Sequence, residues 1–283
     1  MINFKTPEFS ERKFFPPFQG YDVNYSGIHI YRLIIMKHIL TIFALLSVFL
    51  LNAEELPEGF VDLSDIDSTI LLDMRYYTAH NFVGDTIDGY HCPRCILTEK
   101  AALAVASVQE ELLKYGLSLK VYDCYRPQRA VDHFVRWAKD LDDTLTKREF
   151  YPTVEKKNLF KDGFIAEKSS HSRGSTIDLT IVSLPFTEQE AFQPGMELHE
   201  CTNDSTERFG DNSVDMGTGF DCFDELSHSE NPNLSDQQRA RRLLLRALME
   251  KHGFMHYEFE WWHYTYWDEP FKNTYFDFPI ECK

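Results

Sequence analysis

Two short segments that lie far apart in the chain share the residue types of a single metal site. Residues 169–178 read SSHSRGSTID, and residues 260–263 read EWWH. Together they offer the imidazoles of His171 and His263 and the carboxylate of Asp178. Zinc uses such a set of three ligands in catalytic sites, where the fourth position is left to water. A fold that uses these residues must therefore bring both segments to one point.

The first segment runs into a pattern that is typical of a β-strand. From residue 175 to residue 182, apolar residues alternate with polar ones, and Asp178 belongs to the polar set. Alternating side chains lie on opposite faces of a strand, so Asp178 is expected to face away from the apolar set. Gly174 allows the backbone to turn between His171 and this strand, so the two ligands can converge.

Hydrophobic periodicity and turn residues predict the elements around the two segments. The expected elements are helices over 98–115, 127–139 and 235–252 and strands over 117–121, 175–182 and 257–267. Arg126 then lies at a strand-to-helix junction, because Pro127 suits the first turn of a helix. Ser235 and Gln238 form a capping-box pattern at the start of the last helix.

One long stretch, residues 183–234, has few periodic apolar positions and many polar, Gly and Pro residues. Irregular connections of this length are usually functional, and we expect this one to cover the site. No repeat or Ser/Gly linker divides the chain after Ala53. The sequence therefore predicts one α+β domain over 54–283, with a small, mostly antiparallel sheet flanked by helices.

The stretch before this domain has the features of a targeting signal. A basic start at residues 36–38, an apolar run over 39–51 and Asn52-Ala53 match the regions of a secretory signal peptide. The run is shorter than the roughly 20 apolar residues of a membrane span, so we expect no stable membrane insertion after cleavage. We interpret residues 1–35 as a non-native upstream extension and 36–53 as the signal peptide. Export to a periplasmic or secreted location in a bacterial envelope is the expected result.

Composition limits the classes of binding partner and indicates whether the cysteines form disulfides. The formal net charge of −16 argues against nucleic-acid binding. All six cysteines lie after residue 53, and an even number in an exported protein permits up to three disulfides, whose pairing the sequence leaves open. Cys92 and Cys95 form a lone CxxC pair, which is weak evidence for a redox or zinc site. Structural bridges or buried free thiols are the favoured interpretation, and the oligomeric state stays unknown.

The two segments, taken with Tyr125-Arg126-Pro127, resemble the D-alanyl-D-alanine dipeptidase family of zinc peptidases. This family includes the vancomycin-resistance dipeptidases. The resemblance runs from about residue 61 to residue 269, with the motifs in the family's order and at similar separations. It implies a small antiparallel sheet flanked by helices, the fold shared with D,D-carboxypeptidases and hedgehog signalling domains.

The resemblance implies the following roles at the centre of the site. One Zn²⁺ per chain would be bound by His171, Asp178 and His263. Glu260 would act as general base and then general acid, passing a proton from the attacking water to the leaving amine. Arg126 would stabilise the charge of the transition state, although from sequence alone it could also cap local carbonyls or pair with a nearby carboxylate.

Two further residues are implied to bind substrate. Asp221, in the run MGTGFD, matches the position that receives the substrate's ammonium group, and Ser169 could bind the substrate backbone. A turn-capping role for Asp221 and a loop-holding role for Ser169 stay open as alternatives. Trp261 and Trp262 are expected to pack and shape the pocket, and His228 is a candidate for a supporting role near the metal.

The resulting hypothesis is a zinc metallopeptidase that hydrolyses the small D-amino dipeptide D-Ala-D-Ala to two D-alanines. A D,D- or L,D-carboxypeptidase acting on peptidoglycan stem peptides is the alternative enzyme, because related families share the metal ligands and differ in how open the cleft is. A non-catalytic, zinc-stabilised binding module is the third hypothesis. Glu260 and Arg126 argue against the third, since a binding module needs neither.

Overall fold

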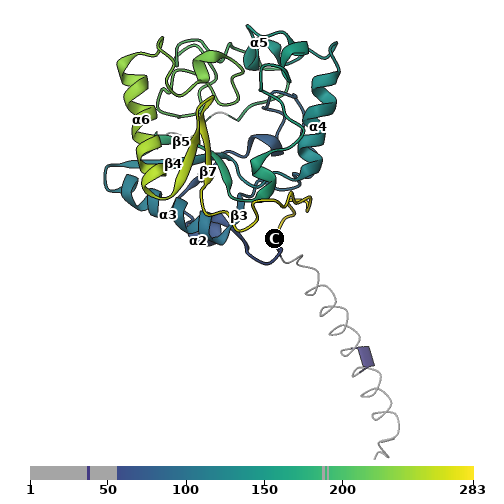
Figure 1. Cartoon of the computed structure of the whole chain (residues 1–283), viewed down its shortest axis with the longest axis vertical. Helices are drawn as coiled ribbons and strands as arrows, with labels where there is room; N and C mark the ends of the chain where they lie inside the picture. Colours follow the sequence, from purple (N-terminus) through teal and green to yellow (C-terminus); the bar gives the residue numbers. More distant parts are fainter. Residues whose placement is uncertain (1–36, 39–55, 187–188, 190) are drawn as a thin grey trace, which may run out of the picture. The chain divides into compact units, whose positions relative to one another are not determined.

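The computed structural model describes residues 37–38, 56–186, 189 and 191–283 (Figure 1). The chain divides into two units, residues 1–53 and residues 54–283, and every element below belongs to the second. The predicted upstream extension and signal peptide lie outside the described residues, apart from Lys37 and His38, which are helical. Among the helices described, none is long and apolar enough to cross a membrane.

A five-stranded sheet forms the centre of this unit and confirms the predicted fold class. Its first two strands are parallel, and every other neighbouring pair is antiparallel. A second, two-stranded antiparallel sheet pairs β1 (Phe60–Asp62) with β3 (Ile96–Thr98). The order in the larger sheet is β2 (Leu71–Leu72), β4 (Leu117–Asp123), β5 (Thr176–Ser183), β7 (Glu260–Tyr266) and β6 (Phe254–Tyr257).

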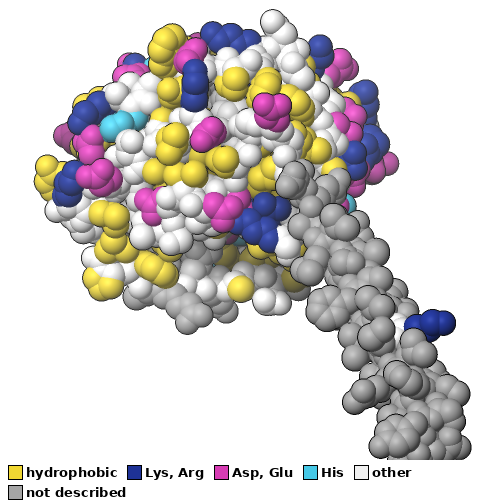
Figure 2. Space-filling model, turned by 90° about the horizontal axis from the view of Figure 1, so that it is seen from below, with side chains coloured by type: hydrophobic (Ala, Val, Ile, Leu, Met, Phe, Trp, Pro, Cys, Tyr) yellow, Lys and Arg dark blue, Asp and Glu magenta, His cyan; other side chains and the backbone are white. Residues whose placement is uncertain are grey.

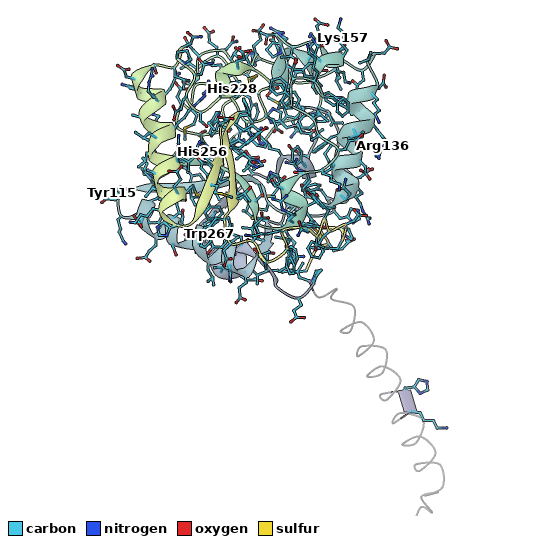
Figure 3. All side chains as sticks on the ribbon, in the orientation of Figure 1. Tyr115, Arg136, Lys157, His228, His256 and Trp267 are labelled. Atoms are coloured by element: carbon cyan, nitrogen blue, oxygen red, sulfur yellow. A yellow bond between two sulfur atoms is a disulfide. The ribbon has the colours of Figure 1, made fainter. Side chains whose placement is uncertain are left out.

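Helices flank the larger sheet, with α6 and α4 on opposite sides of it in Figure 1. Side chains fill the space between these two helices (Figure 3). The predicted capping box is present, because Ser235 accepts from the backbone N–H of Gln238 while Gln238 accepts from that of Ser235. The helices are α2 (Leu63–Ile66), α3 (Glu99–Leu113), α4 (Gln128–Lys139), α5 (Lys147–Phe150) and α6 (Asp236–Lys251), with 3-10 turns η1 (Arg75–Tyr77), η2 (Lys156–Asn158), η3 (Ser170–Arg173) and η4 (Glu225–Ser227).

The central strand β5 is buried on both faces. Asp178 lies on the face opposite the apolar residues, as its position in the sequence predicts, yet its side chain is just as inaccessible. The long irregular segment pairs beside β5 in the plane of the sheet, where Ser213 forms an antiparallel bridge with Val182 and the Val214 N–H donates to the Ile181 carbonyl. A strand covered on both sides can hold polar groups only when they are paired, so its carboxylate requires a nearby cation or donor.

The stretch 257–267, predicted as one strand, is divided in the structure. Tyr257 ends β6 and Glu260 begins β7, with a turn at residues 258 and 259. A register shift between His256 and Tyr257 accompanies the turn. Its consequence is that Tyr257 and Glu260 are cross-strand partners at the tip of a hairpin, which places both beside the site described below.

Three disulfides use all six cysteines: Cys92–Cys282, Cys95–Cys124 and Cys201–Cys222. The two cysteines of the CxxC pair therefore bond to different partners, which agrees with structural bridges and not with a redox pair. On the face seen in Figure 2, apolar side chains are interspersed with acidic and basic ones.

Candidate metal centre and active site

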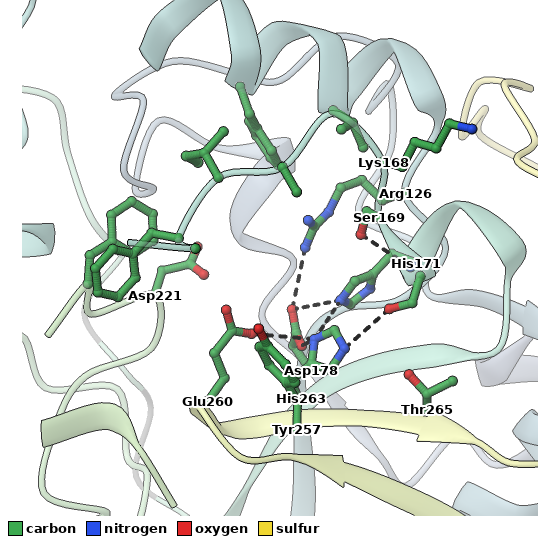
Figure 4. A pocket seen from close by; sticks show the side chains of 18 of the residues that line it. Arg126, Lys168, Ser169, His171, Asp178, Asp221, Tyr257, Glu260, His263 and Thr265 are labelled. Carbon is green, nitrogen blue, oxygen red and sulfur yellow. Dashed lines mark hydrogen bonds and ion pairs between the residues drawn. The ribbon is translucent and has the colours of Figure 1, made fainter. Parts of the chain in front are cut away.

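His171, Asp178 and His263 meet at one point, from η3, β5 and β7 (Figure 4). Asp178 and His263 are register partners across β5 and β7, and the Gly174 backbone, in the left-handed region at φ +80°, turns η3 back onto β5. One donor atom of each residue lies within 4.8 Å of the others. The structure therefore brings together the three ligands that the sequence proposes.

The contacts within this triad fit a central cation. His171 Nε2 lies 3.3 Å from Asp178 Oδ2 and 3.2 Å from His263 Nδ1, and Asp178 Oδ1 lies 3.1 Å from the same Nδ1. Asp178 Oδ1 is buried and receives no hydrogen bond. Two imidazole nitrogens and an unbonded carboxylate oxygen facing one small space form a donor set that suits zinc.

Hydrogen bonds on the outer side of each imidazole orient the ring. His171 Nδ1 donates to the carbonyl oxygen of Cys124 at 2.7 Å. Nε2 is then the unprotonated nitrogen, and its lone pair faces the triad. His263 Nε2 lies 3.2 Å from the hydroxyl of Ser170, which leaves Nδ1 facing the triad. Such outer partners fix the tautomer of a metal-binding histidine. No sequence pattern pointed to Ser170 or to the Cys124 carbonyl, because neither belongs to a ligand residue type.

Burial and mutual charge shift the pKa values of the triad. Burial opposes the ionisation of Asp178, but the adjacent His171 and His263 hold the pKa of its carboxyl well below the ordinary value. Burial lowers the pKa of His171. Burial also acts against charge on His263, yet its contacts with Asp178 and Glu260 raise its pKa overall. An ionised Asp178 and a neutral His171 are the forms that a metal requires.

Glu260 stands at the edge of the triad, as the sequence predicts. Its Oε2 lies 3.4 Å from His263 Nδ1, and its side chain faces the cavity (Figure 4). Burial raises the pKa of Glu260; the nearby Asp178 adds to this shift and His263 partly offsets it. A carboxylate with a raised pKa beside a metal site is suited to accept and return a proton.

Arg126 pairs with a nearby carboxylate, which is one of the alternatives considered from the sequence, and it also faces the cavity. Its Nε donates to Asp123 at 2.9 Å, and one terminal nitrogen lies 3.5 Å from Asp178 Oδ2. The guanidinium also lies over the rings of Tyr76 and Phe134, 4.9 and 5.2 Å from their centroids. It is thus held from behind and presents positive charge to the cavity beside the triad.

Asp221 lines the same cavity and has a contact that its sequence did not reveal. Its carboxylate accepts a hydrogen bond from the Tyr76 hydroxyl at 2.8 Å, and its backbone has a positive φ of 56°. Burial, with a further contribution from Asp178, raises the pKa of Asp221 well above the ordinary value. The sequence analysis did not single out Tyr76, because its contact with Asp221 joins residues that lie 145 positions apart.

The remaining candidates divide between the cavity and its surroundings. Ser169 lines the cavity, and its hydroxyl also accepts from the His171 N–H at 3.3 Å, so both of its proposed roles are compatible with the structure. Trp261 and Trp262 are buried, as expected of packing residues. His228 packs its ring on Phe259 and does not line this cavity.

The cavity has a volume of about 490 Å³. Of the described residues in the long segment 183–234, which was expected to cover the site, only Asp221 and Phe223 line the cavity. Most of that segment packs elsewhere, so it forms one wall and not a lid. Several other residues also line the cavity, although the sequence did not point to them as site residues. They include Tyr76, Phe82, Val131, Phe134, Phe164, Lys168, Ser170 and Tyr257.

Comparison with known proteins agrees with the geometry. The profile of the peptidase family M15, described as D-ala-D-ala dipeptidase, matches residues 57–192 and 201–281. A D-alanyl-D-alanine dipeptidase of Enterococcus faecalis is 38% identical over 225 residues, which are 80% of this chain and 100% of the relative. One of Streptomyces coelicolor is 37% identical over 222 residues, 78% and 97% of the two chains. One of Escherichia coli is 30% identical over 204 residues, 72% and 82%.

These relatives are named as enzymes, and peptidases of this family are metallopeptidases, in agreement with the triad of His171, Asp178 and His263. Both findings favour catalysis over the binding-module hypothesis. The match spans most of the chain after residue 56 and includes both metal-ligand segments. The chain belongs to the D-Ala-D-Ala dipeptidase family of M15 peptidases.

Proposed function

We propose that this protein hydrolyses D-Ala-D-Ala to two D-alanines with a single Zn²⁺ held by His171, Asp178 and His263. The observation that carries the proposal is the convergence of these three residues beside Glu260 and Arg126 in one cavity. When bound, zinc would supply a Lewis acid that polarises a carbonyl and lowers the pKa of a water molecule. The protein's own residues supply the remaining chemistry.

Glu260 moves the proton. It accepts a proton from the water that attacks the scissile carbonyl and returns it to the nitrogen of the departing D-alanine, so no covalent enzyme intermediate is required. The raised pKa of Glu260 supports this role, because it makes the carboxylate a stronger base toward the attacking water, while the protonated carboxyl is still a much stronger acid than the ammonium group that forms on the leaving amine. Its place beside His263 puts the carboxylate within reach of water at the triad.

Arg126 stabilises negative charge on the carbonyl oxygen as the tetrahedral intermediate forms. Its guanidinium is fixed by Asp123 and by two aromatic rings, so little reorganisation is needed during the reaction. The ammonium group of the substrate binds Asp221, which Tyr76 holds in place. The Ser169 hydroxyl binds the dipeptide backbone at the edge of the triad.

The buried position of Asp221 supports a dipeptidase over a carboxypeptidase. The residue is only 6% exposed and lines the cavity, so a substrate that ends there with a free ammonium group pairs with its carboxylate. A longer stem peptide has an amide at this position, which leaves the buried carboxylate with the Tyr76 hydroxyl but without a cationic partner. The substrate preference therefore depends on one charged contact.

The test is to supply the purified, zinc-loaded protein with D-Ala-D-Ala, L-Ala-L-Ala or a stem pentapeptide that ends in D-Ala-D-Ala, and to measure released alanine. We expect cleavage of the D-dipeptide alone. Release of D-Ala from the pentapeptide at a comparable rate would instead identify a wall-trimming carboxypeptidase. Loss of turnover after chelation, with recovery on adding Zn²⁺, checks the metal.

We also propose that the enzyme works outside the cytoplasm, in the periplasm or as a secreted protein. Three disulfides support this location, since such bonds persist in oxidising compartments. The measurement is fractionation of cells that express the full chain, with N-terminal sequencing of the mature protein. Cleavage after Ala53 is expected, and an intact, cytoplasmic chain would contradict the proposal.

A further inference from the structure

The Cys95–Cys124 disulfide lies directly behind the proposed metal centre. Both residues are fully buried, and the bond joins the residue before β3 to the residue after β4. Cys124 stands next to Asp123 and two residues before Arg126. It is therefore embedded in the stretch that carries the charged groups of the site.

Residues 124–126 lie just beyond the regular pairing of the sheet, at the point where they contact the site. The pairing of β4 with β5 is irregular between Val121 and Asp123, and β4 ends at Asp123. Beyond that point, the Tyr125 N–H donates to the Ile96 carbonyl at 2.9 Å. Residues 124–126 are thus attached to the β3 side by one backbone hydrogen bond and by the disulfide.

The other end of the disulfide is itself firmly held. Cys95 immediately precedes β3, which pairs with β1, and its carbonyl accepts from the Leu63 N–H at 2.9 Å. The sulfur bridge therefore connects Cys124 to the smaller sheet and to the start of α2. It fixes the segment relative to a part of the fold that contributes no metal ligand.

The segment carries the backbone carbonyl of Cys124, which accepts a hydrogen bond from the proposed metal ligand His171. The Cys124 carbonyl accepts from His171 Nδ1 at 2.7 Å, and this bond selects the tautomer in which Nε2 faces Asp178 and His263. Outer-shell acceptors of this kind typically change metal affinity or activity by 10- to 100-fold when they are lost. A small shift of residue 124 would weaken that bond.

We propose that the Cys95–Cys124 disulfide is a positioning element, which holds the Cys124 carbonyl so that His171 presents Nε2 to the metal. The inference rests on the proposed metal binding by the triad. The Cys92–Cys282 disulfide provides the matched control, because Cys282 is exposed near the C-terminus and its sulfur lies 3.8 Å from the His91 carbonyl oxygen, with no contact to the triad among the described residues.

The experiment compares zinc dissociation constants, measured by competition with a chelator, among the wild type, C95A/C124A, C95V/C124A and C92A/C282A. We expect both changes at Cys95 and Cys124 to weaken zinc binding by roughly 10- to 100-fold and to lower kcat more than they raise KM. The control should bind zinc like the wild type. C95V/C124A refills the space of the bridge, so recovery of wild-type affinity in that variant would show a packing role and overturn the proposal.

A second measurement uses the wild type without metal, so it does not depend on whether the variants fold. Nitrogen NMR of the metal-free wild type reports which nitrogen of His171 carries the proton. A proton on Nδ1 is expected, and a proton on Nε2 would overturn the proposal, since the Cys124 carbonyl would then not orient the ring. Failure of the wild type to bind zinc would instead refute the proposed function, and the NMR result would stand apart from it.

Discussion

At the residue scale, the cavity contains three carboxylates whose pKa values move in different directions. Asp178 is pushed below its ordinary value by two imidazoles, whereas Glu260 and Asp221 are raised, first by burial. Carboxylates that share one site but differ in protonation can divide the work of catalysis. Here the ionised Asp178 suits a ligand, and Glu260 suits a proton carrier.

Replacing the proton carrier should separate chemistry from metal binding. We expect Glu260→Gln to lower kcat for D-Ala-D-Ala by about 10²- to 10⁴-fold, because general acid-base catalysis contributes on that order. The zinc content should stay near one per chain, since the triad is unchanged. Metal analysis and steady-state kinetics on the same preparation check both points. Substantial residual activity would refute Glu260 as the base.

The substrate contact at Asp221 predicts a change in KM. Asp221→Asn keeps the shape of the side chain but removes the charge that pairs with the ammonium group. We expect KM for D-Ala-D-Ala to rise by roughly 10- to 100-fold, in line with about 1.5–3 kcal/mol for a hydrogen bond to a charged group. Tyr76→Phe should produce a smaller rise in the same direction. An unchanged KM in both variants would return Asp221 to a structural role.

At the scale of the elements, helix α6 holds the loop that carries Asp221. Arg242 is buried and donates to the carbonyls of Met216, Leu226 and His228, on both sides of that loop. Burial lowers the pKa of Arg242 to about 9. Asp221 has a strained positive φ, and such a conformation persists only where its surroundings fix it.

Removing this clamp should loosen the loop and weaken substrate binding. For Arg242→Met we expect the free energy of unfolding to fall by about 3 kcal/mol or more, since each buried carbonyl left without a donor costs about 1–3 kcal/mol. KM for D-Ala-D-Ala should rise as well. Arg241→Met on the same helix is the control, because Arg241 is more exposed and bonds one carbonyl, that of Asp215. Chemical denaturation and kinetics measure the two effects.

A second anchor joins the long segment to β4, an internal strand of the larger sheet. Asp211 accepts from Tyr122 of β4 and from Arg75, and it lies 3.5 Å from Lys120. Burial acts against its charge, but Lys120 and Arg75 outweigh burial and lower the pKa of Asp211. A carboxyl with a lowered folded-state pKa adds stability above its ordinary value, and that stability is lost as pH falls through the folded pKa.

Asp211→Asn should therefore destabilise the protein at neutral pH and flatten the acid side of its stability curve. The expected loss is about 1.5–3 kcal/mol, because Lys120 and Arg75 lose one charged partner but keep their ion pairs with Asp73. Urea denaturation between about pH 2 and pH 7 gives both quantities. An equal stability difference between variant and wild type at every pH would contradict the assignment.

The elements with a strong local signal were predictable. The three long helices follow apolar periodicity and caps, and the alternation around Asp178 identifies β5. The hairpin tip between Tyr257 and Glu260 was missed, because the residues of its turn lack a strong turn signal. The contacts of residue 124 and of Tyr76 were missed for a different reason: they depend on tertiary neighbours that no local pattern encodes.

At the scale of the whole molecule, the site is assembled from parts that no single segment contains. The ligands come from a 3-10 turn and two central strands, the guanidinium from a strand end and the carboxylate at residue 221 from the long connection. Sequence motifs identified most of these residues, because their chemistry restricts the residue types. Their relative placement required the sheet order β4-β5-β7, which the motifs do not specify.

The cross-strand pairing of Asp178 with His263 has one more consequence. Side chains alternate along a strand, so a slip of β7 by a single residue would turn His263 to the other side of the sheet. The proposed metal site therefore forms only when β7 pairs with β5 in the correct register. On the proposed function, zinc in the growth medium should therefore raise the yield of correctly folded enzyme, which is measured as the amount of soluble, active protein purified with and without added zinc.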